Sequence, residues 1–212
     1  MSDAALLIDN VWARPSDRAN ALLRAGVLVL GFALLTAGLA QFEIHLAFTP
    51  VPITGQTLGV LLAGATLGPV LGSSSQLLYW LMGMIGLPFY AGGKSGWTQA
   101  TGATMGYFVG FILAAAAIGY LAQRRNDRNF ASSFAAMALG TVIIYICGAG
   151  WLAHSLHIPV ATGDANAIAY GVTPFLIGDA IKLIIAGALL PAAWIVVGKV
   201  KGQSDGVSDS PR

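Results

Sequence analysis

One acidic and one basic residue interrupt an apolar stretch near the C-terminal end of the sequence. Asp179 and Lys182 lie in the segment 178–182, which reads Gly-Asp-Ala-Ile-Lys. Because they are three positions apart, they share one face of a helix and can partly neutralise each other. An ionisable side chain costs about 2.5 to 3.5 kcal/mol at the centre of a membrane helix and usually faces a bundle interior or a water-filled cavity. The pair therefore predicts a polar ligand site, with an ion pair that only fixes helix packing as the alternative.

The composition places this pair in a membrane. The 212 residues are 56% hydrophobic and only 9% charged, with a formal net charge of +2, whereas ordinary domains carry about a quarter charged residues. Such a chain has too little polar surface to cover a soluble globule and is too apolar for intrinsic disorder. The single cysteine, Cys147, cannot form an internal disulfide, and no Cys/His cluster has zinc spacing. We expect no cofactor, no bound metal and no nucleic acid.

Six apolar runs predict an all-α integral membrane protein built as a six-transmembrane-helix bundle. Helices are expected because lipid cannot satisfy an open backbone, and the runs lack the alternation of barrel strands. The runs cover residues 22–42, 55–71, 74–87, 100–122, 131–153 and 172–197. The membrane domain is thus 22–198, between polar tails at 1–21 and 199–212. If the last helix begins near Val172, Asp179 lies about 10 Å below its outer end.

The distribution of positive charge predicts that both termini are cytoplasmic, because Lys and Arg favour cytoplasmic segments. With six spans, the outer loops hold only Lys94, and Lys182 lies inside the last span. The first 20 residues have no early apolar core, so we expect no signal peptide. The other nine of the eleven Lys and Arg lie on the cytoplasmic side, namely Arg14, Arg18, Arg24, Arg124, Arg125, Arg128, Lys199, Lys201 and Arg212.

The outer loops 43–54 and 88–99 are rich in proline, glycine and aromatic residues. They are either interfacial connectors with Trp and Tyr at the headgroup level or a lid over an outward-facing pocket. The run Gly93-Lys94-Ser95 has part of a phosphate-loop pattern, but the glycine required five residues earlier is Pro88. With the next glycine it also fits the Gly-x-Ser-Gly pattern of intramembrane serine proteases, a short match for which the chain offers only histidines in loops. We do not expect an enzyme.

Two small residues one helical turn apart, Ala33 and Ala37, lie on the first predicted span. Small residues at this spacing let membrane helices approach closely. The pair predicts either close packing inside this bundle or a face that docks against a partner subunit.

Four motifs, in order along the chain, resemble the BioY family of biotin-specific substrate-capture subunits of energy-coupling-factor transporters. The resemblance runs from about residue 25 to about residue 191. The motifs are residues 51–64 (VPITGQTLGVLLAG), 86–93 (GLPFYAGG), 101–107 (TGATMGY) and 178–182 (GDAIK).

The resemblance implies a six-helix bundle that binds biotin from outside a prokaryotic cytoplasmic membrane. It also implies a transmembrane coupling subunit and two cytoplasmic ATPase subunits as partners, beside membrane lipid. The acidic and basic pocket residues of the family carry over to Asp179 and Lys182, and its docking motif to Ala33 and Ala37. Family positions near the pocket or its lid match Tyr107, Gly92 and Gly93.

The chemistry of biotin is compatible with this assignment. Its ureido ring needs both an acceptor and a donor, and its thioether ring needs apolar walls. We expect Asp179 to accept from a ureido N–H and Lys182 to donate to the ureido oxygen or the carboxylate, with Gln56, Tyr90 and Tyr107 as further contacts. An ion-coupled secondary transporter for a small vitamin-like solute is the alternative. It would use Asp179 as its only well-placed acid and would normally show two comparable halves.

Overall fold

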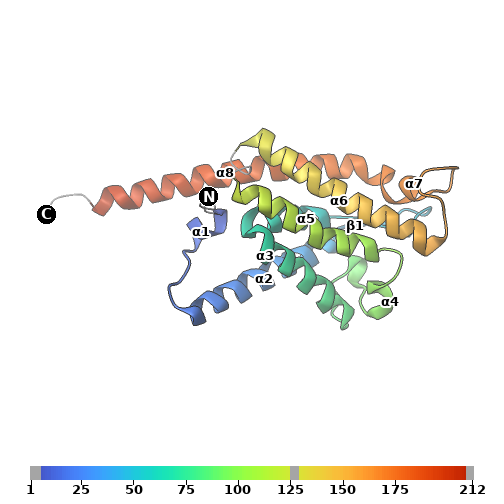
Figure 1. Ribbon diagram of the computed structural model, residues 1–212, viewed down its shortest axis with the longest axis horizontal. Helices are drawn as coiled ribbons and strands as arrows, with labels where there is room; N and C mark the ends of the chain where they lie inside the picture. Colours follow the sequence, from blue (N-terminus) through green and yellow to red (C-terminus); the bar gives the residue numbers. More distant parts are fainter. Residues whose placement is uncertain (1–5, 125–128, 209–212) are drawn as a thin grey trace.

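The computed structural model describes residues 6–124 and 129–208, with the backbone alone from residue 199 onward. The described part is mostly helical, and its long helices lie along one another as an elongated bundle (Figure 1). A short antiparallel ribbon pairs Glu43 with Thr54 and Ile44 with Ile53. The elements are α1 (Leu7–Val11), α2 (Arg18–Ala40), β1 (Glu43–Ile44), β2 (Ile53–Thr54), α3 (Gln56–Met84), η1 (Ala91–Gly93), α4 (Trp97–Ala100), α5 (Met105–Gln123), α6 (Phe130–Leu156), α7 (Ala167–Gly171), η2 (Thr173–Phe175) and α8 (Leu176–Ser208).

Five helical segments of the described chain are long and apolar enough to cross a membrane, which makes this a multi-pass membrane protein. The segments are Arg18–Ala40, Gln56–Met84, Met105–Gln123, Phe130–Leu156 and Ala167–Gly198. The sequence predicted six such helices. The difference arises because the second and third apolar runs, 55–71 and 74–87, lie in the single element α3.

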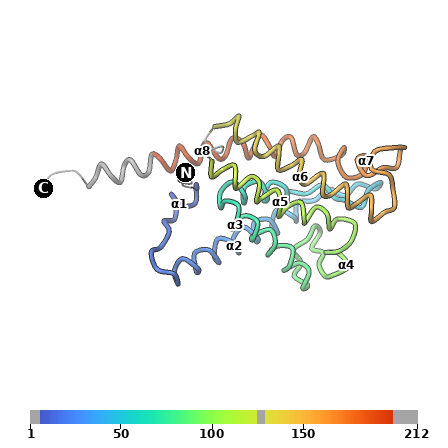
Figure 2. Tube along the Cα trace, viewed as in Figure 1, coloured from blue at the N-terminus to red at the C-terminus, as the bar shows by residue number. Residues whose placement is uncertain are grey.

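The element α3 is a hairpin of two helical arms and not a straight helix. Gly68 has φ +82° and ψ −179°, which interrupts the helix, and Pro69 follows it. A Cβ added at Gly72 would lie 3.0 Å from the Gly64 Cα, and Gln56 Nε2 donates to the Tyr79 hydroxyl at 2.5 Å. In one continuous helix, Gln56 and Tyr79 would be about 35 Å apart. The chain therefore reverses at Gly68, and Figure 2 follows its path.

Glycines allow α3 and α5 to pack with their backbones in close contact. A Cβ at Gly64 would lie 2.6 Å from the Ala115 carbonyl oxygen, and one at Gly119 would lie 2.3 Å from the Gly68 carbonyl carbon. On the other side of α5, a Cβ at Gly106 would meet the Cys147 carbonyl oxygen on α6. Such close approach strengthens van der Waals packing, a main source of helix association in lipid. These contacts fix α5 between α3 and α6.

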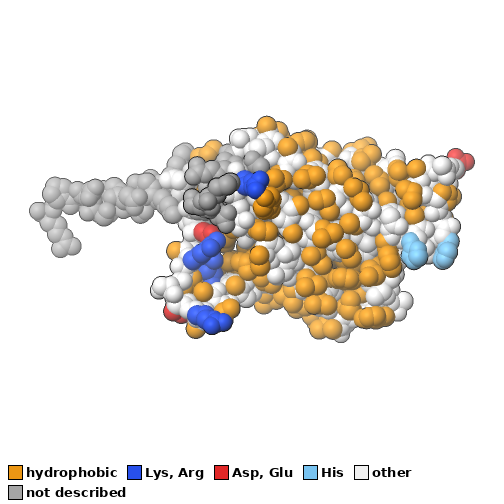
Figure 3. Space-filling view, in the orientation of Figure 1, with side chains coloured by type: hydrophobic (Ala, Val, Ile, Leu, Met, Phe, Trp, Pro, Cys, Tyr) orange, Lys and Arg blue, Asp and Glu red, His pale blue; other side chains and the backbone are white. Residues whose placement is uncertain are grey.

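The surface separates into an apolar middle and polar ends. On the face seen in Figure 3, the visible Lys and Arg side chains lie toward the end where α1 and α2 begin, and histidine side chains lie at the opposite end. Arg125, Arg128 and Arg212 lie outside the described residues, as do the side chains of Lys199 and Lys201. The cytoplasmic location of both termini stays a prediction.

The two predicted polar tails include helical structure. Within 1–21, α1 carries the buried Leu7, the preceding Leu6 is buried as well, and Asp17 caps α2 by accepting from the Asn20 backbone N–H at 2.9 Å. At the other end, α8 continues from the membrane domain through Ser208. Residues 1–5 and 209–212 lie outside the described chain.

Candidate ligand-binding pocket

A pocket with a cavity volume of about 60 Å³ lies where the two predicted outer loops meet α3, α5, α6 and α8. Val51 and Pro52 line it from the first loop, and Tyr90 and Ala91 from the second. Its walls are mostly apolar, with a few polar groups on one side, which is the usual constitution of a small-molecule site. The polar lining residues include Gln56, Thr57, Tyr145, Asp179 and Lys182.

The predicted pair Asp179 and Lys182 lines this pocket as a buried ion pair. Lys182 Nζ lies 2.7 Å from Asp179 Oδ1, and the two side chains are 16% and 6% exposed. Asp179 lies in the first turn of α8, which begins at Leu176 and not near Val172 as expected. The short elements α7 and η2 precede it.

Groups from α3 and the strand before it complete the surroundings of Lys182. Its ammonium donates to the Thr54 carbonyl oxygen at 2.6 Å and to Thr57 Oγ1 at 3.0 Å. The Thr57 hydroxyl donates in turn to Asp179 Oδ1 at 3.0 Å. All three N–H donors of the lysine thus have an acceptor among the described residues, and this network fixes the orientation of the cation.

Tyr145 on α6 is a member of the site that the sequence did not reveal. Its hydroxyl donates to Asp179 Oδ2 at 2.5 Å, opposite the oxygen that meets Lys182. The only signal was a phenol in the apolar run Ile143-Ile144-Tyr145-Ile146. Thr57 was also missed, although it directly follows the predicted Gln56. Both residues position the Asp179 carboxylate.

The three other side chains expected at the site, Gln56, Tyr90 and Tyr107, also line the pocket. Their hydrogen-bonding groups have internal partners. Gln56 accepts from Thr54 Oγ1 at 2.9 Å, the Tyr90 hydroxyl donates to the Trp80 carbonyl oxygen at 2.6 Å, and the Tyr107 hydroxyl donates to the Gly171 carbonyl oxygen at 2.7 Å. The rings of the two tyrosines therefore serve as apolar wall.

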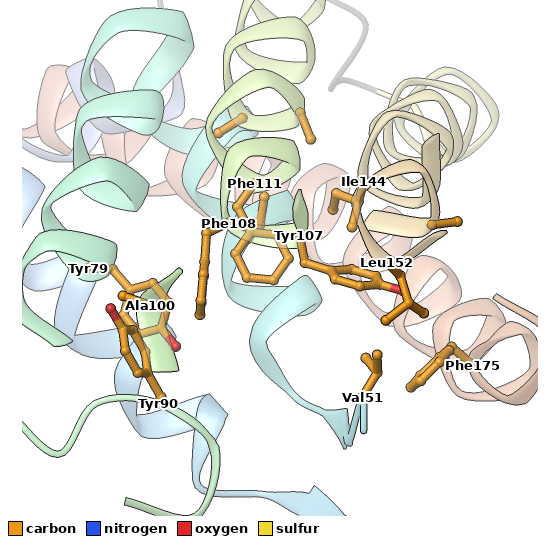
Figure 4. Close-up of a cluster of buried hydrophobic side chains, with 14 of the residues drawn as sticks. Val51, Tyr79, Tyr90, Ala100, Tyr107, Phe108, Phe111, Ile144, Leu152 and Phe175 are labelled. Carbon is orange, nitrogen blue, oxygen red and sulfur yellow. The ribbon is translucent and has the colours of Figure 1, made fainter. Parts of the chain in front are cut away.

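Aromatic side chains form much of that wall, and α5 carries them to both sides. In Figure 4, Tyr107 points toward Leu152 while Phe108 points toward Tyr79 and Tyr90. The Phe108 ring centroid lies 4.9 Å from that of Tyr90. The sequence did not single out Phe108, because phenylalanine is common in membrane helices whatever it faces.

Gly92 and Gly93 are not among the pocket-lining residues. They form the turn η1, both with positive φ, and the Gly93 N–H donates to Gln41 Oε1 at 3.1 Å. A Cβ at Gly92 would lie 2.5 Å from Glu43 Oε1. The two glycines thus shape the loop that brings Tyr90 and Ala91 to the pocket, while a direct contact with ligand stays a prediction.

Ala33 and Ala37 face the interior of this chain. They are 0% and 6% exposed and belong to the main apolar core. Their spacing allows close packing within the bundle, and a docking role stays a prediction.

Ser95, on which the serine-protease alternative depends, is exposed in the loop between η1 and α4. Among the described residues, no three His, Cys, Asp or Glu side chains lie close enough to hold a metal ion.

Replacing Tyr145 with Phe removes one donor to the Asp179 carboxylate and keeps the ring. Hydrogen bonds to charged groups contribute about 1.5 to 3 kcal/mol, and the loss leaves Asp179 less firmly oriented. We expect ligand affinity to fall by about tenfold, as measured by equilibrium binding to the purified protein. Tyr120→Phe, at a half-exposed tyrosine on α5, is the matched control. Equal affinities for the two variants would contradict the positioning role.

The sequence is similar to known proteins of one family. A sequence model of the BioY family matches residues 13–199. The biotin transporter BioY of Rhizobium etli is 36% identical over 178 residues, covering 80% of this chain and 92% of that protein. The biotin transporter BioY of Thermotoga maritima is 36% identical over 168 residues, covering 79% and 92%.

A solved structure has the same fold. The crystal structure of the S-component for biotin from an ECF-type ABC transporter matches with a TM-score of 0.73 and 25% identity, covering 84% of this chain and 94% of that one. The family match covers the whole of the predicted membrane domain 22–198, and the relatives are matched over most of their own length. The chain therefore belongs to the BioY family.

Proposed function

We propose that this protein captures biotin at the pocket beside Asp179 and Lys182 and supplies it for uptake as the substrate-binding subunit of an energy-coupling-factor transporter. The observation that carries the proposal is the hydrogen-bonded cluster of Thr57, Tyr145, Asp179 and Lys182 at one side of an aromatic pocket. The relatives named as biotin transporters support the choice of ligand.

The cluster offers both kinds of partner that a ureido group needs. A ureido ring presents two N–H donors and one oxygen acceptor. The Asp179 carboxylate accepts from an N–H, and the Lys182 ammonium donates to the oxygen when biotin replaces one of the three acceptors that this ammonium has within the chain. The aromatic wall takes the thioether ring and the methylene tail. A site built from buried polar groups discriminates strongly against analogues that leave those groups unpaired. We therefore expect selectivity for the ureido group.

Ligand retention tests this function directly. The purified protein should retain biotin through washing in detergent and should not retain thiamine or riboflavin, because neither has a ureido group on a compact bicycle. The measurement is mass spectrometry of small molecules released by denaturation. Retention of another vitamin without biotin would contradict the proposal.

We also propose six membrane crossings, with both termini on the cytoplasmic side of a prokaryotic cytoplasmic membrane. The reversal at Gly68 supports separate crossings by the two arms of α3. These arms are about 18 and 24 Å long, shorter than the hydrocarbon core of about 30 Å. Neighbouring helices must therefore separate the ends of the two arms from the lipid. An even number of crossings keeps the arginines of α2 and the end of α5 on one side, in agreement with the positive-inside rule.

The proposed partner is a transmembrane coupling subunit with two ATPase subunits. An exposed apolar surface of α2 is its proposed binding site. Opposite the buried alanines, exposed residues recur every three or four positions along α2. Val27, Leu30 and Leu34 are 48%, 42% and 46% exposed, and Gly31 between them has nothing within 4 Å of an added Cβ. The buried alanines then hold α2 against the bundle while this outer face meets the partner.

The variant Gly31→Trp tests the outer face without disturbing the core. The added ring points away from the bundle, so we expect biotin affinity to stay within about twofold. Energised uptake by the assembled transporter should be lost, because a bulky side chain prevents close helix approach. The control is Ile146→Trp at an exposed position on α6. If both variants support normal uptake, α2 does not dock through this face.

A further inference from the structure

Two polar side chains of the biotin pocket take no part in the cluster around Asp179. Gln99 on α4 and Thr104 at the start of α5 both line the pocket. Within the described part of the chain, the structure records no hydrogen bond to or from the Gln99 amide or the Thr104 hydroxyl. Each of these groups can both donate and accept. The pocket therefore keeps hydrogen-bonding capacity for a ligand away from its charged pair.

The Thr104 hydroxyl is available although Thr104 stands at a helix start. It is the N-cap residue of α5, where a threonine side chain usually accepts from a backbone N–H of the first turn. Thr104 instead has φ −94° and ψ 1°, and its side chain makes no capping hydrogen bond. The Tyr107 backbone N–H donates to the Thr104 carbonyl oxygen at 3.0 Å. The main chain alone closes this turn, which leaves the hydroxyl for the pocket.

The backbone beside both side chains is held from two other helices. Trp80 Nε1 on α3 donates to the Ala100 carbonyl oxygen at 3.2 Å. Trp151 Nε1 on α6 donates to the Gly102 carbonyl oxygen at 2.9 Å. The two polar side chains are thus positioned by bonds in which they take no part, so they can be replaced without removing those bonds.

These neutral groups and the charged pair lie at opposite ends of the pocket. Figure 4 shows Ala100 and Phe175 on opposite sides of Phe108. Ala100 directly follows Gln99, and Phe175 is four residues before Asp179. In Figure 1, α4 lies along the lower edge of the bundle and α8 along the upper edge. A ligand that spans the pocket meets an ion pair at one end, aromatic rings in the middle, and neutral donors and acceptors at the other end.

We propose, on the basis of the proposed capture of biotin, that Gln99 and Thr104 bind the end of the biotin tail and that the protein accepts tail amides of biotin as well as the free acid. A tail carboxylate accepts from the Thr104 hydroxyl and the Gln99 amide N–H. A tail amide also donates, and the Gln99 amide oxygen accepts that hydrogen bond. An ammonium group would suit the carboxylate alone, but Lys182 lies at the ureido end.

The test compares biotin with biotinamide, the primary amide of its tail, by calorimetric titration of the purified full chain. We expect the two ligands to bind within about threefold of each other, because Gln and Thr side chains both donate and accept. Gln99→Leu and Thr104→Val should each weaken both ligands by about fivefold, a usual loss for one hydrogen bond. Thr98→Val, at an exposed position on α4, is the matched control and should change neither affinity.

A third ligand separates direct contact from a disturbed fold. An analogue whose tail ends in a methyl group has no polar tail end, so Gln99→Leu and Thr104→Val should not change its affinity. Equal weakening of all three ligands would show only a structural role and would overturn the proposal. Unchanged binding of biotin and biotinamide by both variants would overturn it as well. If one variant fails to fold, the other still decides.

The charge of the tail gives the sharpest contradiction. Binding of biotinamide about 30-fold or more weaker than biotin would show that the carboxylate pairs with a cation, and would overturn the proposal. Lys94 lies in the same outer loop, exposed and outside the pocket lining, so Lys94→Gln should leave the ratio of the two affinities unchanged. Binding of neither ligand would contradict the proposed function itself, whereas binding of biotin without biotinamide would contradict only the tail assignment.

Discussion

We expect biotin affinity to fall by at least about 30-fold when Asp179 is replaced by Asn. Three donors converge on the native carboxylate, from Thr57, Tyr145 and Lys182. An amide keeps one acceptor oxygen but directs an N–H₂ group toward donors, and it leaves the buried Lys182 without its counter-charge. Removing one partner of a buried, hydrogen-bonded charge pair costs about 2 to 5 kcal/mol, which corresponds to a loss of about 30-fold or more.

Lys182→Ala should produce a loss of similar size for the complementary reason. It removes the donor to the ureido oxygen or the carboxylate and leaves Asp179 with two hydroxyl donors but no cation. The measurement is calorimetric titration of the purified variants with biotin. Asp164→Asn, at an exposed acid in the loop before α7, controls for the general effect of losing a carboxylate. Unchanged affinity in both pocket variants would remove this pair from the binding site.

The second large effect concerns stability, and it follows from Gly119 on α5. A Cβ there would lie 2.3 Å from the Gly68 carbonyl carbon and 2.3 Å from the Pro69 nitrogen. These are backbone atoms of the turn that reverses α3, so neither can move without opening the hairpin. We expect Gly119→Ala to lower the free energy of unfolding by about 2 to 4 kcal/mol, within the range found for overpacked cores and strained backbones.

The matched control is Gly26→Ala on α2, where an added Cβ has nothing within 4 Å. In a helix interior, alanine is favoured over glycine by about 0.5 to 1 kcal/mol, so this variant should be neutral or slightly more stable. Thermal unfolding in detergent, followed by circular dichroism, compares the two. A Gly119→Ala protein as stable as the Gly26→Ala protein would show that the contact between α5 and the α3 turn is loose.

The central pair of the site could be predicted because charge is costly in lipid. Asp179 and Lys182 lie within an apolar stretch, and the spacing of three places them on one helix face. Tyr145 could not be found in this way, because tyrosine is tolerated in membrane helices and its partner is 34 residues further along the chain. Side chains that meet across helices leave no local signal.

The apolar runs located the helices but not all of their ends. The break expected between the apolar runs 55–71 and 74–87 lies at Gly68, where one residue with positive φ suffices to reverse the chain. Composition cannot reveal so short a break. The spacing of Ala33 and Ala37 left open whether the neighbouring helix belongs to the same chain or to a partner, and in this chain both residues are buried inside the bundle.

The hydrogen bond from Lys182 Nζ to the carbonyl oxygen of Thr54 affects which substitutions the loop before α3 tolerates. A main-chain acceptor is present whichever residue stands at position 54. Point mutations in the loop before α3 can therefore accumulate without removing this anchor of the ammonium group, provided that the path of the backbone is kept. An insertion or deletion between residues 44 and 54 would displace it, so changes of loop length should be more damaging than changes of side chain.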